Sequence, residues 1–274
     1  MSLRPSSLPG LLALGLFATP SAAVAAPPKP PSRMSPATVE GTRLIVTAKY
    51  GRKVSDQGLI GAVIVASTPE GETTEFRIDR IVPDARHKTG DVQLYTFSVR
   101  DAEGAWREYC TPDPDGISGG FPLAGTWRSD GKHVRGGFSV TCTSGAIGKC
   151  VTFGYRPWAR DARGRSLWDA HQACVRMLRA DYCGNGNAHT RNGVHIDIVD
   201  AYGLMAERSP ELSFEAAWTP DGAACVSHVR LPNGLWTLPR GEESCPLQRK
   251  GRGGPMCRER GALGRRGVLM FNRS

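Results

Sequence analysis

The chain has no long hydrophobic run and few aromatic residues. Its 274 residues have a mean hydropathy of −0.31, and aromatic residues make up 7% of them. The apolar stretch from Leu11 to Ala18 is far shorter than the roughly 20 residues that a membrane-spanning helix needs. No other stretch is long or apolar enough to cross a bilayer. The sequence therefore predicts no transmembrane segment.

Cysteine is missing from the first part of the chain, and the cysteines that follow lack metal-binding spacing. No cysteine precedes Cys110, so the sequence offers no lipid-attachment cysteine near its start. No two cysteines form a C-x-x-C pair, which argues against a structural zinc site. We also find no internal repeat of the length typical of solenoids.

The first 26 residues have the pattern of a secretory signal peptide. Arg4 precedes the apolar run, and small residues follow it up to Ala25 and Ala26. We expect cleavage after one of these two alanines and a secreted or periplasmic protein. Residues 27–38 are rich in proline and have little to bury, so they are expected to form an extended linker.

The formal charge of +9 is concentrated near the end of the chain. Residues 240–274 hold nine Lys or Arg residues against three Glu residues. Such a segment is suited to binding anionic polymers of the cell envelope. However, no aromatic residue accompanies the cations before Phe271, which argues against nucleic acid and favours a solvated basic tail.

The eight cysteines predict disulfide bonds in an exported protein. Two short strands around the glycine-containing stretch at 144–149 suggest a hairpin that pairs Cys142 with Cys150, and Cys245 and Cys257 flank a second local loop. Four cysteines then remain, and two ways of pairing them stay open. These are Cys110–Cys174 with Cys183–Cys225, or Cys110–Cys183 with Cys174–Cys225.

A helix is predicted from Ser166 to Cys183, with Gly184 at its end. Apolar residues recur at helical spacing, and Asp169 follows Ser166 by three residues, as in a capping box. Nine residues of helix would separate Cys174 from Cys183 by about 13 Å, which is too far for a disulfide bond. His171 lies on the apolar stripe and is expected to be a hydrogen-bonded core residue.

The remaining pattern predicts an α+β fold that is mainly β, with one central helix and antiparallel sheets stabilised by disulfides. Before residue 107, strand-like runs alternate with glycine-containing turns, for example over Val92–Val99. We therefore divide the chain after the linker into an N-terminal β unit (39–107), a core domain (108–239) and the basic, Gly- and Arg-rich segment (240–274), which contains the second local disulfide.

The tetrapeptide Ala180-Asp181-Tyr182-Cys183 stands in the run RADYCGNGNAHTRNGVHIDIVD. Together with GAIGKCVTFGYRPW at 145–158, this run resembles the bacterial extracytoplasmic family named after the tetrapeptide, the ADYC domain. The resemblance implies an exported protein and a structural motif made of the last three of these residues and Gly184. It implies no particular activity.

The candidate catalytic residues are His189, His195, Asp197 and Glu215. In a strand over Val194–Val199, His195 and Asp197 would point to one face about 6.5–7 Å apart. With His189 in the preceding loop, they could do acid–base chemistry or hold a metal ion. A histidine beside an aspartate on a strand is more often a simple polar pair, so we assign no metal site.

Glu215 is the one carboxylate in a largely apolar strand, and it needs a partner. Arg156 or Arg179 would make a structural ion pair, whereas Asp197 would make a carboxylate pair. The ion pair is favoured. The sequence thus predicts an exported binding or cell-envelope module that has no catalytic activity and no cofactor. The alternative is an extracytoplasmic hydrolase, with or without a metal ion, that uses the His/Asp residues.

Overall fold

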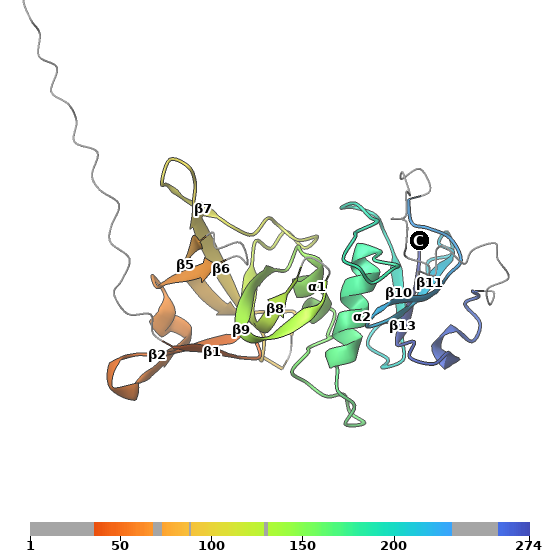
Figure 1. The fold of residues 1–274 in the computed structure, drawn as a ribbon, viewed down its shortest axis with the longest axis horizontal. Coiled ribbons are helices and arrows are strands. Elements are labelled where there is room, and N and C mark those ends of the chain that lie inside the picture. Colours follow the sequence, from red (N-terminus) through yellow and green to blue (C-terminus); the bar gives the residue numbers. More distant parts are fainter. Residues whose placement is uncertain (1–35, 68–72, 88, 129–130, 232–256) are drawn as a thin grey trace, which may run out of the picture. The chain divides into compact units, whose positions relative to one another are not determined.

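The computed structural model describes residues 36–67, 73–87, 89–128, 131–231 and 257–274. In these residues the fold is mainly β, as predicted, with three antiparallel sheets and two α-helices (Figure 1). The strands are β1 (Ala37–Glu40), β2 (Arg43–Thr47), β3 (Lys53–Ser55), β4 (Val63–Ser67), β5 (Thr73–Pro83), β6 (Gln93–Arg100), β7 (Trp106–Glu108), β8 (Gly120–Trp127), β9 (His133–Cys142), β10 (Asp197–Asp200), β11 (Phe214–Thr219), β12 (Gly222–Val226) and β13 (Met270–Arg273). The helices are α1 (Ala146–Thr152) and α2 (Trp168–Arg179), with three short 3-10 helices, η1 (Lys49–Gly51), η2 (Asp56–Leu59) and η3 (Ala262–Gly264).

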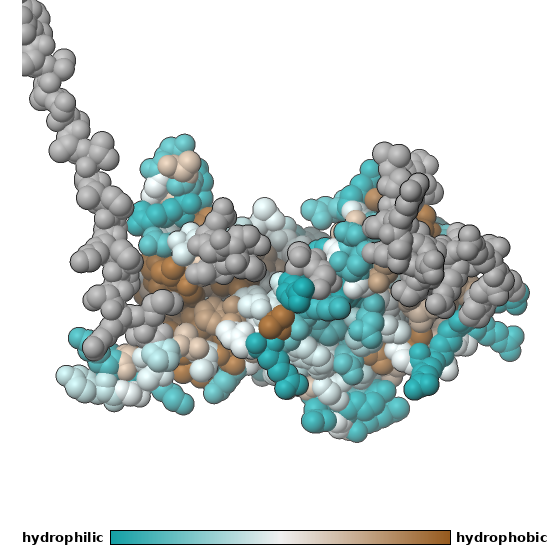
Figure 2. All heavy atoms as spheres, viewed as in Figure 1, coloured by the Kyte–Doolittle hydropathy of each residue, from teal (hydrophilic) through white to brown (hydrophobic). Residues whose placement is uncertain are grey.

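The first half of the fold is built from two sheets that share a hydrophobic core. The larger sheet has the order β4-β5-β6-β8-β9, with β7 paired to β6, and the smaller one has the order β1-β2-β3. Their apolar residues are visible in Figure 2 between the β1–β2 strands and the β5–β6 strands. The sheets are also linked by a buried hydrogen bond in which the Leu44 N–H donates to the Tyr95 hydroxyl at 3.0 Å.

The larger sheet extends beyond the boundary that we placed between residues 107 and 108. β8 pairs with β6 through Tyr95 and Gly120, and β9 pairs with β8 along its length. A bridge between Cys110 and Cys142 joins the segment before β8 to the end of β9. The strands of this sheet therefore continue to Cys142.

The second half is organised around the third sheet, whose order is β10-β13-β11-β12. Neighbouring residues alternate between its two faces, as strand geometry requires. Ile198 and Ala216 pack in the cluster that contains α2, whereas Val199 and Ala217 pack in a second cluster with the residues around η3. Because both faces are covered, all four residues of β10 are buried.

The end of the chain is a strand inside this sheet, so the prediction of a solvated tail from residue 240 is wrong for its last part. β13 lies between β10 and β11 and pairs with both. Met270 is fully buried and Phe271 is 3% exposed. We predicted a solvated segment from the charge of residues 240–274, although a short apolar run precedes Asn272. Residues 240–256 lie outside the described part.

Residues 146–152 form α1, so the predicted hairpin that pairs Cys142 with Cys150 is wrong. The glycines that suggested a turn instead allow close packing. A Cβ on Gly148 would lie 2.2 Å from the carbonyl oxygen of Cys142. As a result, α1 starts directly beneath the end of β9 and turns Cys150 toward α2. In the part of the chain that the structure describes, no helix is both long and apolar enough to cross a membrane.

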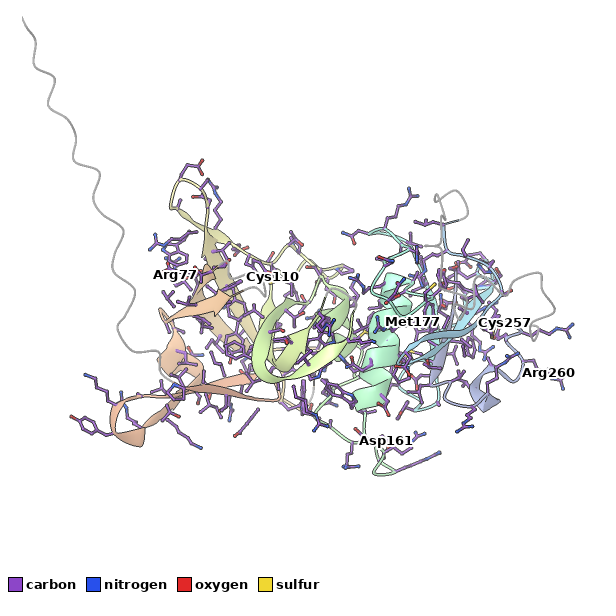
Figure 3. The ribbon with its side chains drawn as sticks, in the orientation of Figure 1. Arg77, Cys110, Asp161, Met177, Cys257 and Arg260 are labelled. Carbon is purple, nitrogen blue, oxygen red and sulfur yellow. A yellow bond between two sulfur atoms is a disulfide. The ribbon has the colours of Figure 1, made fainter. Side chains whose placement is uncertain are left out.

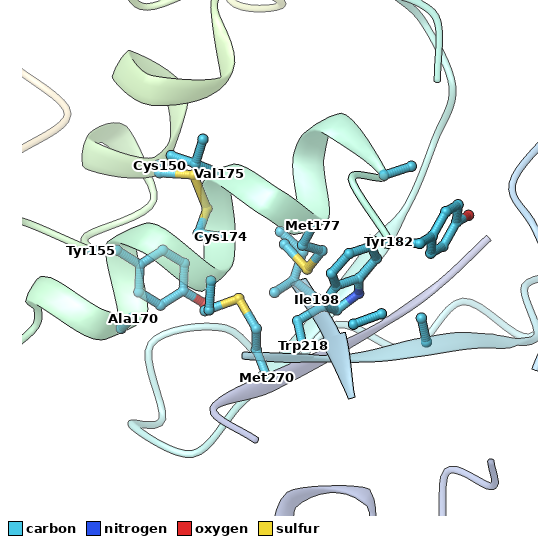
Figure 4. Close-up of a cluster of buried hydrophobic side chains, with 14 of the residues drawn as sticks. Cys150, Tyr155, Ala170, Cys174, Val175, Met177, Tyr182, Ile198, Trp218 and Met270 are labelled. Carbon is cyan, nitrogen blue, oxygen red and sulfur yellow. A yellow bond between two sulfur atoms is a disulfide. The ribbon is translucent and has the colours of Figure 1, made fainter. Parts of the chain in front are cut away.

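The disulfide bonds join elements that are distant in sequence. Cys110 bonds to Cys142, Cys150 to Cys174 across α1 and α2, and Cys225 to Cys257, with Cα–Cα distances of 5.4, 5.9 and 5.4 Å (Figures 3 and 4). Cys183 is also disulfide-bonded.

These bonds replace the predicted pairs. Cys257 bonds to Cys225, so the local pair with Cys245 is wrong; Cys245 itself lies outside the described residues. Both pairings proposed for the other four cysteines are also wrong, because Cys110, Cys174 and Cys225 have other partners. We had expected disulfides within local loops, whereas the disulfides in the structure join different elements.

Candidate functional site

A cleft of about 680 Å³ lies beside the end of α2. The end of α2 and the residues of α1 form two of its walls, and the loops at 113–115 and 188–196 contribute the others. The tetrapeptide at 180–183 follows α2 directly. Its first three residues, Ala180, Asp181 and Tyr182, fix the geometry next to this cleft, and each does so in a different way.

Ala180 ends α2 four residues before the glycine that the sequence predicted as the helix end. Its backbone is in the left-handed region, with φ 50° and ψ 41°, and its N–H bonds back to the carbonyl of Met177. This conformation costs about 1–2 kcal/mol for a residue with a Cβ atom. The methyl group of Ala180 is fully buried in the core, which offsets part of that cost. Residues 181–183 therefore form a turn outside the helix.

The carboxylate of Asp181 organises the glycine-rich loop that follows. It accepts the backbone N–H groups of Asn185 at 3.1 Å and Gly186 at 2.9 Å, and it forms a buried ion pair with Arg176. Gly184 and Gly186 both have positive φ, which glycine adopts without strain. The loop is thus a turn whose N–H groups bind the protein's own carboxylate, and these groups are not free for an external anion.

Tyr182 joins a fully buried polar network. Its hydroxyl donates to Glu215 at 2.8 Å and accepts the backbone N–H of Arg230 at 2.8 Å. The Arg230 guanidinium donates to both oxygens of Glu215, at 3.0 and 3.1 Å, and the Asn272 amide donates to the same carboxylate at 2.6 Å. Burial, and then the Glu215 charge, raise the pKa of Tyr182. The Tyr182 ring stacks on Trp218, with ring centroids 5.3 Å apart (Figure 4).

The partner of Glu215 is Arg230. The two arginines predicted for this role, Arg156 and Arg179, do not pair with it. Arg230 also donates to the carbonyls of Met177 and Leu178 in the last turn of α2. A cation at this position is further favoured by the helix dipole. Arg156 pairs with Asp91 instead, at 2.7 Å. Glu215 therefore has a structural partner, as the ion-pair interpretation required, and it does not line the cleft.

Replacing Gly184 with alanine is expected to destabilise the protein by about 2–3 kcal/mol. A Cβ atom at this position would lie 1.7 Å from the carbonyl oxygen of Asp221, and φ is +69°. The turn between β11 and β12 would have to move away. Gly164→Ala is the matched control, because φ there is +76° but no heavy atom lies within 4 Å. Urea denaturation of both variants measures the difference, and equal midpoints would contradict the close packing.

His195 and Asp197 are close neighbours but differ in exposure. His195 Nε2 lies 3.8 Å from Asp197 Oδ1; the His195 side chain is 69% exposed and the Asp197 side chain 1%. Asp197 accepts the hydroxyl of Ser209 at 2.8 Å and also its backbone N–H. The strand begins only at Asp197, so the predicted alternation from Val194 does not hold. His195 lines the cleft and Asp197 anchors a loop.

His189 lies apart from this pair. Its ring stacks on Tyr182 with centroids 5.9 Å apart, and it is not a lining residue of the cleft. Among the residues that the structure describes, no three His, Cys, Asp or Glu side chains are grouped to hold a metal ion. His171 is a core residue, as predicted: it is fully buried, its Nε2 lies 3.1 Å from the carbonyl of Ile147, and burial lowers its pKa to about 4.

Five cationic side chains line the cleft, and two of them are neutralised. Arg86 binds Asp113 and Asp115, at 2.8 and 2.9 Å, and also Asp84. Arg230 is held by Glu215. Arg230 and Glu215 cancel each other, whereas Arg86 stands against three carboxylates, so neither arginine adds positive charge to the cleft.

The other three cations, Lys149, Arg179 and Arg191, have no acidic partner within the described ranges. Arg179 donates to the carbonyl of Gly186 at 2.5 Å, and its Nε atom is buried without a hydrogen-bond acceptor. Lys149 is partly exposed and Arg191 is exposed. The cleft thus combines these three cations with apolar side chains, which include Phe153, Leu178, Val194 and Ile196.

The sequence interpretation did not include these cations among the site residues. Lys149 was assigned to a hairpin turn, and Arg179 was considered only as a partner for Glu215. The three are separated by up to 42 positions in the chain, and the packing of α1, the end of α2 and the loop at 188–196 brings them to one cleft. A helix assigned to 146–152 would have been the one signal in the sequence that pointed to Lys149 as a site residue.

The chain matches the model of a known protein family over much of its length. Residues 56–232 match the model of the ADYC domain. No curated protein and no solved structure gives a significant match to the chain. The matched range contains the tetrapeptide and every lining residue of the cleft. Because it covers more than half of the sequence, the chain belongs to the ADYC domain family.

Proposed function

We propose that this protein is an exported, disulfide-stabilised module that binds an anionic ligand in the cleft and does not catalyse a reaction. The observation that carries the proposal is that three cations, Lys149, Arg179 and Arg191, share one cleft and have no acidic partner among the residues that the structure describes. Uncompensated cations in a concave site concentrate anions there.

Export is supported by two independent features of the chain. The disulfide bonds fit an extracytoplasmic protein, because such bonds persist in oxidising compartments. The charged, apolar and small-residue regions at 1–26 match a signal peptide in sequence; they lie outside the described residues. The proposed place of action is therefore the periplasm or the cell exterior.

A non-catalytic role is supported by the contacts of the candidate catalytic residues. Glu215 binds Arg230, Asp197 binds Ser209, and His189 stacks on Tyr182. Of the four candidates, His195 alone lines the cleft. A hydrolase would need a second group that converges on the same point.

The size and lining of the cleft indicate the kind of ligand. Its volume of about 680 Å³ lies within the range of small-molecule sites. Because the cations stand beside Phe153, Leu178 and Ile196, the site suits a ligand that joins a negatively charged group to an apolar part. Anionic polymers of the envelope are one source of such groups. Binding of these polymers by the segment at 240–274 remains a separate prediction, and residues 240–256 of it lie outside the described part.

Phenyl phosphate is expected to bind the protein, and the Lys149→Gln/Arg191→Gln variant is expected to bind it about tenfold more weakly. Each substitution removes a charged donor that has no acidic partner in the described part of the chain. Inorganic phosphate should bind more weakly than phenyl phosphate, because it leaves the apolar side chains uncovered. Isothermal titration calorimetry at low salt measures all three affinities.

Arg135→Gln/Arg163→Gln is the charge-matched control, since both arginines are exposed and do not line the cleft. An equal loss of affinity in this control would show that net charge alone binds the phosphate, and would contradict the proposal. So would unchanged binding in the cleft variant. Release of phenol by the protein would instead contradict the non-catalytic part.

A further inference from the structure

The hairpin that joins β2 to β3 carries an unusual tip, which we define as residues 49–53. The tip has the sequence Lys-Tyr-Gly-Arg-Lys, and all five residues are exposed. The hairpin extends away from the larger sheet at the lower left of Figure 1. Tyr50 has a relative exposure of 104%, the largest among the exposed large hydrophobic residues of the described chain. An aromatic side chain at this position contributes no packing to the fold.

The tip is also strongly basic. Lys49, Arg52 and Lys53 contribute three positive charges within five residues, and the tip contains no acidic residue. In the described structure none of the three forms an ion pair. Asp56, which follows β3, is bound to Arg43 on β2 at 3.1 Å. The three cations are therefore available to an external anion.

The backbone of the tip makes tyrosine an unfavourable choice for stability. Tyr50 has φ 61° and ψ 24°, and Gly51 has φ 75°, so two successive residues are in the left-handed region. Glycine or asparagine is the usual residue at such a position, and a tyrosine there is strained. Since the ring gains no contacts in return, folding does not explain it. A residue that is unfavourable for its backbone conformation and gains no packing contact in return is typical of a functional site.

We propose that this tip docks the protein on an anionic lipid bilayer, with the Tyr50 ring in the headgroup region and the three cations against lipid phosphates. Tyrosine is enriched at membrane interfaces because its ring is apolar and its hydroxyl is polar. Clustered lysine and arginine residues are attracted to anionic headgroups. The tip precedes the range that matches the ADYC domain, so family membership does not account for it.

A bilayer fits the observations better than a soluble polyanion does. Charge alone would serve a polymer, and lysine or arginine at position 50 would add to it. A ring that projects fully from a narrow tip is suited instead to entering a layer that is apolar on one side and polar on the other. The proposal is independent of the ligand that the cleft binds, because no tip residue lines the cleft.

Two variants test the proposal by sedimentation with vesicles of phosphatidylglycerol and phosphatidylcholine. Lys49→Gln/Arg52→Gln/Lys53→Gln is expected to weaken partitioning by at least about tenfold. Tyr50→Gly is expected to weaken it about threefold. The same Tyr50→Gly change should leave the thermal midpoint unchanged or higher, because it relieves the strained backbone. Lost binding without lost stability is a result that a structural role for Tyr50 would not give.

The charge-matched control is Arg135→Gln/Arg163→Gln/Arg266→Gln, which removes three exposed cations outside the tip. An equal loss of vesicle binding in this control would overturn the proposal, as would full binding by the tip variants. Binding to soluble polyphosphate without binding to vesicles would assign the tip to a polyanion and would also overturn it.

Discussion

A chain that lacks Met270–Ser274 is expected not to fold. β13 pairs with β10 on one side and with β11 on the other, so its removal leaves two strands without their partner. It also removes Met270 and Phe271, both almost fully buried. Deleting each of these side chains alone costs about 2–5 kcal/mol, which together approaches the 5–15 kcal/mol that stabilises a domain. Urea denaturation followed by tryptophan fluorescence measures the loss, because Trp218 donates to Asn272 on β13.

Met270→Leu is the matched control for this deletion. It keeps the volume of the side chain in the core and should cost less than about 1.5 kcal/mol. If the truncated chain instead showed the same cooperative urea transition as the full chain, β13 would be peripheral. The C-terminal residues would then be the solvated tail that their composition suggests. Truncation is for the same reason a poor test of anion binding by residues 240–274, since it removes a strand together with the charges.

Strand β6 of the larger sheet could be predicted because its signal is local. The expected run Val92–Val99 corresponds closely to β6. Its pattern depends on residues two positions apart, and turn residues flank the run. Local alternation and turn residues were thus sufficient for this part of the fold.

The failures arise where a residue's partner is far away in the sequence. Cys150 was given the cysteine eight positions before it, whereas it bonds to Cys174 on the next helix. A short segment with two glycines is compatible with a turn or with a closely packed helix, and only the position of β9 decides between them. The charge surplus at 240–274 concealed a four-residue strand in the same way, because the sheet that needs this strand was not yet defined.

The candidate site could be predicted only in part, for a similar reason. The closeness of His195 and Asp197 follows from their spacing, and the structure shows it. Their different exposures do not, because they depend on Ser209 and on the covering of both faces of β10. The need of Glu215 for a partner was visible as a carboxylate among apolar residues. Its partner, Arg230, comes from a different segment.

Glu215→Ala is expected to lower the free energy of unfolding by about 3–5 kcal/mol. The substitution leaves the Arg230 guanidinium buried without a counter-ion, and it removes the acceptor of the Tyr182 hydroxyl and the Asn272 amide. It therefore disturbs the end of α2, the turn after it and β13 together. Urea denaturation at neutral pH measures the change. Glu211→Gln, on the exposed surface, should stay within about 0.5 kcal/mol of the unmodified protein.

Glu215→Gln separates a structural role from a catalytic one. All groups that face the carboxylate are donors: the Tyr182 hydroxyl, two nitrogens of Arg230 and the amide of Asn272. A glutamine would turn its own NH₂ group toward some of these donors, so it should destabilise the protein by about 2–3 kcal/mol despite its equal size. A catalytic carboxylate outside such a network would lose its chemistry on this change but keep its stability. A Glu215→Gln protein as stable as the original would therefore refute the structural assignment and return Glu215 to the candidate catalytic residues.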